Sequence, residues 1–407
     1  MAKKEIKQRP IQTVLCFTTY FKGVQFIKTC KEIGCKVMLI TSKKLEHKEW
    51  PRESLDEIFY IPDDNENVNM DNVMKGIAYI MREHQFDIIV ALDDYDVERV
   101  AHIREEFRIP GMGQTTARHF RDKLAMRIQA KDSGLLVPPF TDVFNNKTVA
   151  TYISQVPAPW VLKPRSAASA VGIKKIQTAD QLWYILDTLG DKRFQYVLEQ
   201  FVPGDVFHVD ALINNDKVLF SRVHQYMNTP MEVAHEGGVF RSHTLTYGSE
   251  DEKALQAMNV EVLKTFGLRR GASHTEFIKA HADGKFYFLE TSARVGGANI
   301  VEMVEASSGI NLWAEWAKIE VFQDNYKLPK INKDYSGIIV SLAKQQFPDT
   351  SAYSDPEICW RMNMENHAGL IVKSKKLERV KDLLNQYASR FYTDFFAKAP
   401  IRDVPTN

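Results

Sequence analysis

Two glutamates in the second half of the chain, Glu276 and Glu290, have the residue type and spacing to bind a divalent cation. They lie in strand-like runs joined by the turn-rich residues 281–284, where an Asp-Gly pair predicts a β-hairpin. A loop of three or five residues places Glu276 opposite Glu290. The same register places Ile278 opposite Phe288. Carboxylates facing each other about 5 Å apart repel by roughly 3 kcal/mol at an effective dielectric constant near 20. A bound Mg²⁺, which prefers oxygen ligands, reverses the sign of that interaction.

The residues after Glu290 supply a positive charge and a flexible backbone. The run Glu290-Thr-Ser-Ala-Arg294-Val-Gly-Gly297 places an arginine four residues after the glutamate, followed by two glycines. A metal, an arginine and a backbone that allows close approach together indicate a phosphoryl-transfer site. A two-residue Asp-Gly turn would instead shift the register by one residue and place the two glutamates on opposite faces. The hairpin would then be a surface element with scattered charges.

Two lysines upstream could bind the phosphates of a nucleotide. Lys123 lies in an expected helix and Lys163 in an expected strand, and each can reach a polyphosphate as a point charge. Between Lys163 and Gly172 the chain is rich in Ser and Ala, so its backbone N–H groups can approach a phosphate closely. A lysine before a proline, as at Lys163, is more often solvated surface. The argument therefore depends on the order and spacing of the whole set.

The strand-like run 197–202 ends at a Pro-Gly turn and could bind a nucleoside. Its edge backbone groups could hydrogen-bond a purine, and Phe201 offers an apolar face. Asp205, just past the turn, can accept hydrogen bonds from ribose hydroxyls. Further along, His208 and Asp210 share one face of a strand. Such a pair can also be an ordinary hydrogen-bonded pair with no contact to ligand.

The N-terminal part of the chain alternates strands with helices, which predicts a parallel, doubly wound sheet. No GxGxxG follows its first strand, so a dinucleotide site is disfavoured there. Asp93, Asp94 and Asp96 lie where a strand ends and a helix begins, which helix capping explains more simply than metal binding. The expected strands cover residues 13–17, 36–40, 57–61 and 87–92, and the expected helices 23–33, 71–84 and 95–107.

The rest of the chain mixes both element types and predicts an α/β protein, α+β overall, of four parts. These are an N-terminal α/β domain at 1–114, subdomains at 115–204 and 205–328, and a small C-terminal α/β segment at 329–407. Strands are expected at 160–164, at 195–199, between 204 and 223, at 336–342 and at 369–373. An irregular loop is expected after residue 223 through residue 238. Helices are expected at 115–133, 179–189, 251–266, 300–322 and 376–390.

Composition excludes several classes of protein. The 407 residues carry a formal net charge of +1, so bulk electrostatics favour neither nucleic acid nor a membrane surface. Apolar runs fall short of the roughly 20 residues that a membrane helix needs. The first ten residues lack a signal-peptide core, which favours a cytoplasmic protein. Cys16, Cys30, Cys35 and Cys359 show no metal-binding spacing and are expected to be reduced packing residues.

Taken together, these motifs resemble the ATP-grasp superfamily over about residues 115–330. The family pattern has a helical Lys, a Lys-Pro strand followed by a small-residue loop, a Glu-rich hinge, a metal-binding Glu, and then Glu-x-Asn-x-Arg. The resemblance implies an ATP-grasp fold with two subdomains that clamp ATP. It implies ATP-binding residues Lys123, Lys163, Ser169, Glu199, Gln200, Phe201, Val202, Asp205 and His208. It implies metal ligands Glu276, Glu290 and Ser292, and catalytic residues Arg294, Lys163, Gly296 and Gly297.

Two departures from the family pattern affect these assignments. The usual Asn is Ser292, a shorter ligand, which puts the coordination of a second metal ion in doubt. Alanines at 167, 168 and 170 stand where many members have glycines, so loop closure over ATP would be stiffer. Biotin carboxylases continue from the arginine with Gln-Val-Glu-His, which is absent. Arg294-Val-Gly-Gly297 is instead similar to ligases that join amino acids, and His235-Glu-Gly-Gly238 matches the place of their Gly-Gly loop.

The resemblance implies an ADP-forming ligase. ATP and Mg²⁺ (or Mn²⁺) would activate a carboxylate, such as that of an amino acid, as an acyl phosphate. An amine would then displace phosphate and form an amide or peptide bond. The alternatives are an ATP-grasp carboxylase or nucleotide-biosynthetic ligase, and a non-catalytic ATP-binding regulatory protein, which Ser292 would suit. The expected partners are small-molecule carboxylates and amines, with no nucleic acid or membrane, and a homodimer through the N-terminal unit would fit such a family.

Overall fold

The computed structural model describes residues 11–62, 68–167, 172–236 and 238–397. The chain divides into two compact units, Met1–Gln114 with Trp316–Tyr326, and Thr115–Glu315 with Lys327–Asn407. The four-part division expected from the sequence is finer than this and stays a prediction. Within the described residues, no helix has the length and apolar character needed to cross a bilayer.

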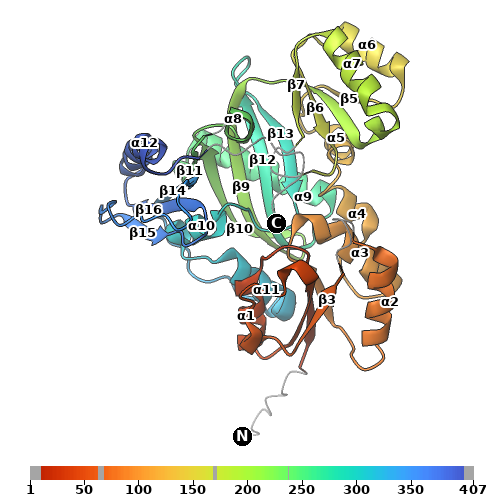
Figure 1. The fold of residues 1–407 in the computed structure, drawn as a ribbon, viewed down its shortest axis with the longest axis vertical. Helices are drawn as coiled ribbons and strands as arrows, with labels where there is room; N and C mark the ends of the chain where they lie inside the picture. Colours follow the sequence, from red (N-terminus) through yellow and green to blue (C-terminus); the bar gives the residue numbers. More distant parts are fainter. Residues whose placement is uncertain (1–10, 63–67, 168–171, 237, 398–407) are drawn as a thin grey trace, which may run out of the picture. The chain divides into compact units, whose positions relative to one another are not determined.

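The first unit, whose residues up to 114 are drawn in red to orange in Figure 1, contains a parallel four-stranded sheet in the order β3-β2-β1-β4. Its interior is apolar, and all of Val14–Phe17 on the central strand is fully buried. Asp93 accepts a hydrogen bond from the Tyr95 amide, which confirms the capping interpretation for this residue. Asp96 makes no capping hydrogen bond and accepts from the Thr19 amide instead. The strands are β1 Thr13–Thr18, β2 Lys36–Ser42, β3 Glu57–Ile61 and β4 Ile88–Ala91, and the helices α1 Val24–Glu32, α2 Met70–Ile80 and α3 Val97–Glu106. The predicted alternation is therefore confirmed.

The second unit begins with a small antiparallel sheet in the order β5-β8-β6-β7. Two amphipathic helices, α6 and α7, close one hydrophobic core against it. The elements are β5 Phe140–Asp142, α6 Asn146–Gln155, β6 Trp160–Pro164, β7 Lys174–Ile176, α7 Ala179–Leu189 and β8 Tyr196–Gln200.

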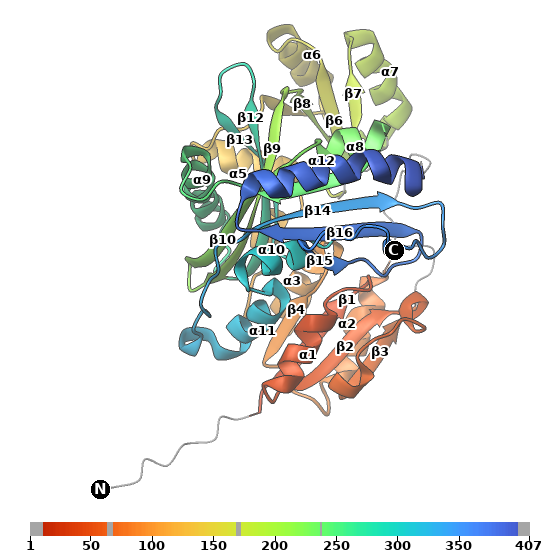
Figure 2. The ribbon, with the colours of Figure 1, turned by 90° about the vertical axis from the view of Figure 1, so that its left-hand side faces the viewer.

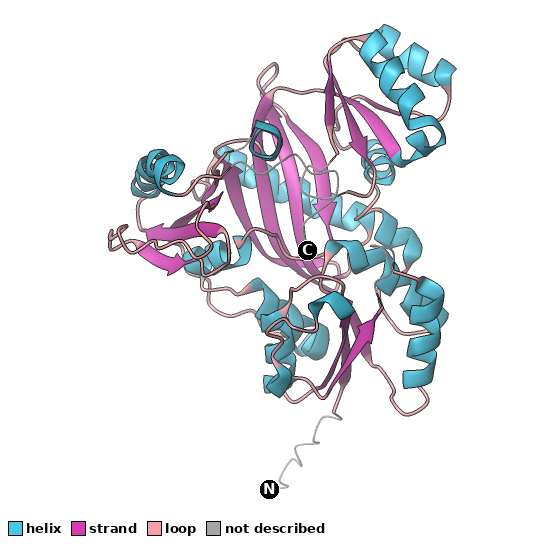
Figure 3. Ribbon diagram, in the orientation of Figure 1, coloured by secondary structure: helices cyan, strands magenta, loops and turns pink. Residues whose placement is uncertain are grey.

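A larger antiparallel sheet follows in the order β13-β12-β9-β10-β11-β14-β16-β15. Figure 3 shows its strands in magenta, apart from those of the small sheet. The C-terminal segment therefore extends this sheet, and Figure 2 shows α12 lying along β14 and β16. The strands are β9 Gly204–Asn214, β10 Lys217–Tyr226, β11 Phe240–Thr244, β12 Arg270–Ala280, β13 Phe286–Ser292, β14 Tyr335–Leu342, β15 Ile358–Arg361 and β16 His367–Ser374. The helices are α8 Pro230–Glu236, α9 Glu250–Phe266, α10 Ile300–Ser308 and α12 Leu377–Asp394.

Several expected elements are wrong in detail. The helix expected over 115–133 is two helices, α4 Gln114–Arg118 and α5 Lys123–Asp132, because the Asp122 side chain caps the second one. The helix expected over 300–322 is α10 and α11 Leu312–Phe322, since Gly309 adopts φ 73° and ends the first. Strands β5, β11 and β15 and helix α6 are absent from the predicted elements, and helix α8 lies where an irregular loop was predicted. Cys359 is exposed and is not a packing residue, whereas the other three cysteines are buried.

Candidate active site

A cavity of about 640 Å³ in the second unit gathers most of the residues singled out from the sequence. Its walls come from both sheets, from the start of α5 and from the loop after β13. The predicted residues that line it are Lys123, Lys163, Glu199, Gln200, Phe201, Val202, Glu276, Glu290, Ser292, Arg294 and Gly297. The lining does not include Asp205, His208 or Gly296. Ser169 lies outside the described residues.

The hairpin of β12 and β13 places Glu276 opposite Glu290, as predicted. The expected pairing of Ile278 with Phe288 is wrong, because a bulge follows the glutamates and Ile278 faces Tyr287 instead. The bulge leaves Leu289 without an opposite residue on β12, and its carbonyl accepts a hydrogen bond from Arg127. The two carboxylates therefore keep a common face although the hairpin is irregular.

The two facing carboxylates have different partners. Glu290 Oε2 lies 2.8 Å from Lys123 Nζ. Glu276 Oε1 accepts a hydrogen bond from the Tyr226 hydroxyl at 2.8 Å and lies 3.6 Å from His274 Nε2. Ser292 follows Glu290 by two residues on the same strand and also lines the cavity. Carboxylate and hydroxyl oxygens are hard donors, so this set fits Mg²⁺.

Lys163 is held by a buried glutamate on the neighbouring strand. Glu199 Oε2 lies 2.8 Å from Lys163 Nζ, and Arg127 Nη2 lies 3.0 Å from Glu199 Oε1. Glu199 is 1% exposed. Burial opposes its ionisation, but Arg127 and Lys163 outweigh that effect and lower the pKa of Glu199 to about 2. This carboxylate is therefore committed to two cations and fixes the position of Lys163.

The hinge after β8 offers fewer backbone amides for a nucleobase than the sequence indicated. The Gln200 amide donates to the Pro139 carbonyl at 2.8 Å, and the Phe201 amide donates to the Pro159 carbonyl at 3.0 Å. These two amides are therefore already used, and nucleobase binding through the Val202 amide and the hinge carbonyls stays a prediction. The Lys175 ammonium lies 3.7 Å from the centre of the Phe201 ring, and both residues line the cavity.

Two residues assigned to nucleotide binding lie elsewhere. Asp205 is exposed and lies 3.6 Å from His281, outside the cavity lining, so its ribose contact stays a prediction. His208 is fully buried, and its two ring nitrogens lie 2.7 Å from Asp210 and 2.8 Å from Ser242. The ring of Tyr226 packs 4.6 Å from it. The nucleotide-binding assignment of His208 is therefore wrong, and the alternative of an ordinary hydrogen-bonded pair holds.

In the loop after β13, some residues line the cavity and others pack against the interior. Arg294 and Gly297 line the cavity, and Arg294 Nη1 donates to the Val295 carbonyl at 2.8 Å. Gly296 faces inward. A Cβ at this position would lie 2.9 Å from Asp210 Oδ1 and 3.0 Å from His274 Nδ1. A side chain has no room there, and Gly296 is buried outside the cavity lining, so its catalytic role stays a prediction.

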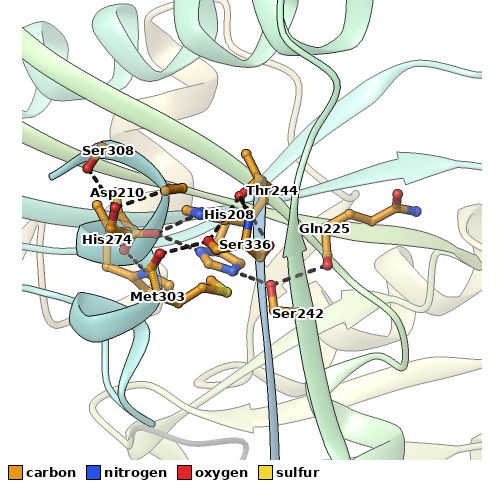
Figure 4. A network of polar contacts seen from close by, with 12 residues as sticks. His208, Asp210, Gln225, Ser242, Thr244, His274, Met303, Ser308 and Ser336 are labelled. Atoms are coloured by element: carbon orange, nitrogen blue, oxygen red, sulfur yellow. Dashed lines mark hydrogen bonds and ion pairs between the residues drawn. The ribbon is translucent and has the colours of Figure 1, made fainter. Parts of the chain in front are cut away.

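Asp210 forms a buried polar cluster with His208, His224 and His274. Figure 4 shows Asp210 beside His208 and His274. His208 Nδ1 and His274 Nδ1 lie 2.7 and 2.8 Å from its two oxygens. Burial opposes ionisation of Asp210, but His208 and His274 outweigh it and hold the pKa of Asp210 well below its usual value. Burial also lowers the pKa of His224 to about 3. Burial opposes protonation of His274, but Asp210 and Glu276 raise its pKa to about 9. His274 is therefore the cationic partner.

Three important residues escaped the sequence argument, and two of them had a detectable signal. Arg127 lies four residues after Lys123, on the same face of α5. His274 lies two residues before Glu276, on the same face of β12. Tyr226 had no such signal, because its contact with Glu276 joins strands that are not neighbours in the sheet.

Residues 156–302 match the model of the ATP-grasp domain. The chain contains an ATP-grasp domain. The glutamate hairpin, Lys163, Glu199 and Arg294 all fall within this matched range.

Two relatives are similar to the chain beyond the ATP-grasp domain. An L-arginine-specific L-amino acid ligase of Bacillus subtilis is 25% identical over 272 residues, which are 65% of this chain and 64% of the relative. A D-alanine–D-alanine ligase of Prosthecochloris aestuarii is 25% identical over 236 residues, which are 52% of this chain and 63% of the relative. The chain thus spans just under two thirds of the length of these relatives.

Solved structures show the same fold around the ATP-grasp domain. The L-amino acid ligase from Bacillus licheniformis has a TM-score of 0.75 at 16% identity and covers 96% of this chain and 100% of its own. The biotin carboxylase from Campylobacter jejuni has a TM-score of 0.68 at 14% identity, covering 95% of this chain and 92% of its own. At these identities the likeness establishes the fold alone.

Proposed function

We propose that this protein is an ATP-dependent carboxylate–amine ligase that acts on amino-acid-like substrates. The observation that carries the proposal is the facing pair Glu276 and Glu290, set in one cavity with two lysines and Arg294. The relatives that are named as amino-acid ligases support the same reaction class.

ATP would bind with its phosphates at the two lysines. Phosphoryl transfer depends mainly on positioning and on neutralising charge, and Lys123 on α5 and Lys163 on β6 both supply positive charge to the cavity. The apolar side chains of Val161, Phe201 and Leu289 line the same cavity and would contact the base.

A divalent cation would complete the charge balance. Glu276, Glu290 and Ser292 would hold Mg²⁺, with Mn²⁺ as an alternative ion. When bound, the ion neutralises the phosphate charge that develops during transfer. Glu290 is bonded to Lys123 in the structure, so this carboxylate would exchange partners as the ion and nucleotide arrive.

Arg294 would bind the carboxylate substrate. One carboxylate oxygen attacks the γ-phosphorus, and the bond from this phosphorus to the oxygen that bridges it to the β-phosphate breaks. The products are ADP, which is the leaving group, and an acyl phosphate. The substrate amine then attacks the acyl carbon, loses a proton, and expels inorganic phosphate. Arg294 faces the negative charge on the acyl oxygen in this second step. Gly297, which lines the cavity without a side chain, lets the backbone approach the substrate closely.

A phosphate-release screen over amino acids, singly and in pairs, tests the proposed reaction. We expect release with Mg²⁺ and ATP to require a pair of amino acids, with a dipeptide detected by mass spectrometry. Release that needs bicarbonate and no amine would favour a carboxylase instead. ATP binding by calorimetry with no turnover across the screen would favour a regulatory protein.

The variant Glu290→Gln tests the site. Removing one of the facing carboxylates should lower ADP release at least about a hundredfold, because loss of even an outer contact of a metal site costs 10- to 100-fold. Glu261→Gln, the same change on the exposed face of α9, is the control and should behave as wild type. Normal turnover in Glu290→Gln would contradict the site assignment.

A cytoplasmic location and a homodimer through the N-terminal unit remain predictions. Sedimentation velocity of the purified chain measures the second of these directly.

A further inference from the structure

The buried pair Asp210–His274 contacts two parts of the candidate site, the Glu276 carboxylate and the loop that carries Arg294. Asp210 is fully buried, whereas His274 is 8% exposed and lines the cavity beside Glu276. Figure 4 shows Asp210 next to His208 and His274, with Ser242 beyond His208. Burying a carboxylate is unfavourable unless it is paired and hydrogen-bonded. Apolar side chains would fill this space at lower cost. The contacts of the polar pair must therefore explain why it is buried here.

The first connection runs from the pair to Glu276. His274 Nδ1 donates to Asp210 Oδ1 at 2.8 Å, which fixes the plane of the imidazole ring. The opposite ring nitrogen, Nε2, then lies 3.6 Å from Glu276 Oε1. The Tyr226 hydroxyl donates to the same oxygen at 2.8 Å and lies 3.5 Å from His274 Nε2. Glu276 is therefore held through Oε1 by two neighbours that also line the cavity, Tyr226 and His274.

The second connection runs from the pair to the loop that carries Arg294. The Cα of Gly296 packs directly on the pair, because a Cβ there would lie 2.9 Å from Asp210 Oδ1 and 3.0 Å from His274 Nδ1. Arg294 and Gly297 line the cavity on either side of this contact. The position of the loop is therefore set by the same two side chains that orient Glu276.

We propose that Asp210 and His274 are positioning residues that fix the Glu276 carboxylate and the Arg294–Gly297 loop relative to each other. The inference rests on the proposed function. The distance between Glu276 and Arg294 matters only if Glu276 binds the metal ion and Arg294 binds the substrate. Outer partners of a metal ligand restrict its orientation and typically change metal affinity or activity 10- to 100-fold when they are removed.

The main test is the affinity of His274→Gln for Mn²⁺ in the presence of a non-hydrolysable ATP analogue, measured by electron paramagnetic resonance. We expect Mn²⁺ to bind about 10- to 100-fold more weakly than in wild type. The control is His243→Gln, the same change at a histidine of the same sheet, buried on β11 and bonded to the Thr244 carbonyl. Mn²⁺ affinity in the control should match wild type, and thermal unfolding of both variants measures the structural cost.

Should His274→Gln fail to fold, Tyr226→Phe makes a parallel test. It keeps the aromatic packing and removes the 2.8 Å hydrogen bond to Glu276, and we expect Mn²⁺ binding to weaken several-fold. Mn²⁺ affinity equal to wild type in the folded variants would overturn the inference and leave the ligase proposal untouched. Wild-type protein that binds Mn²⁺ and nucleotide but joins no substrates would overturn the ligase proposal. The Mn²⁺ affinities of the variants would still test the positioning role.

The loop contact has its own test in Gly296→Ala. The added Cβ should displace the loop from Asp210 and raise the KM for the carboxylate substrate more than it lowers Mn²⁺ affinity. The reverse pattern is expected for His274→Gln. An unchanged KM in Gly296→Ala would overturn the part of the inference that concerns the loop.

Discussion

Two lysine–glutamate pairs face the same cavity and differ in how firmly they are held. Glu199 is 1% exposed and bonded to both Lys163 and Arg127. The Glu290 side chain is 33% exposed and lies 2.8 Å from Lys123. A buried carboxylate with two cations cannot lose a partner without a large cost. In the second pair the carboxylate is partly exposed, and the buried Lys123 has the Ala167 carbonyl as another partner. The first pair is therefore built as a fixed support for Lys163, and the second can exchange its lysine for a metal ion.

The largest effect on stability is expected when the buried Glu199 loses the guanidinium of Arg127. Arg127→Met should lower the free energy of unfolding by about 3–5 kcal/mol, because the buried Glu199 is left with one cation. Unfolding in urea measures the change. Lys131→Met, on the exposed side of the same helix, is the matched control and should change little. If Arg127→Met were as stable as this control, the distinction between the two pairs would fail.

A pH dependence specific to Glu199 should be nearly as large. Its pKa falls from 4.5 to about 2 on folding, so its contribution to stability is complete above about pH 4.5 and is lost as the pH falls towards 2. The shift corresponds to about 3 kcal/mol. The measurement is the difference in unfolding free energy between wild type and Glu199→Gln from pH 6 to pH 2.5. We expect this difference to shrink on acidification, and a constant difference would contradict the assignment.

The smallest effect is expected at the partly exposed Glu290. Glu290→Gln should lower the free energy of unfolding by about 1 kcal/mol, because water screens the 33% exposed carboxylate and the buried Lys123 keeps its hydrogen bond to the Ala167 carbonyl. The same variant is expected to lose ADP release, so stability and activity separate at Glu290. A large loss of stability in this variant would make Glu290 a structural residue like Glu199.

Patterns local in the sequence predicted much of the fold and of the site. The alternating strands and helices of the first unit follow from hydrophobic periodicity, and the Glu276–Glu290 register follows from the alternation of side chains along two strands. The misses share a cause. Asp122 and Gly309 divide helices whose hydrophobic pattern continues past them, and β11 is defined by its pairing with β14, far along the chain.

The sequence by itself determined which residue types stand at which spacing: paired glutamates on a hairpin, two lysines, and an arginine before two glycines. Only the tertiary structure decided their partners. It assigned Glu199 to Arg127 and Lys163, removed His208 from the cavity, and placed Gly296 on the Asp210–His274 pair. The physical reason is that residue type and periodicity act over a few residues. The burial and pairing of a charge, by contrast, depend on segments that meet only after the sheets have formed.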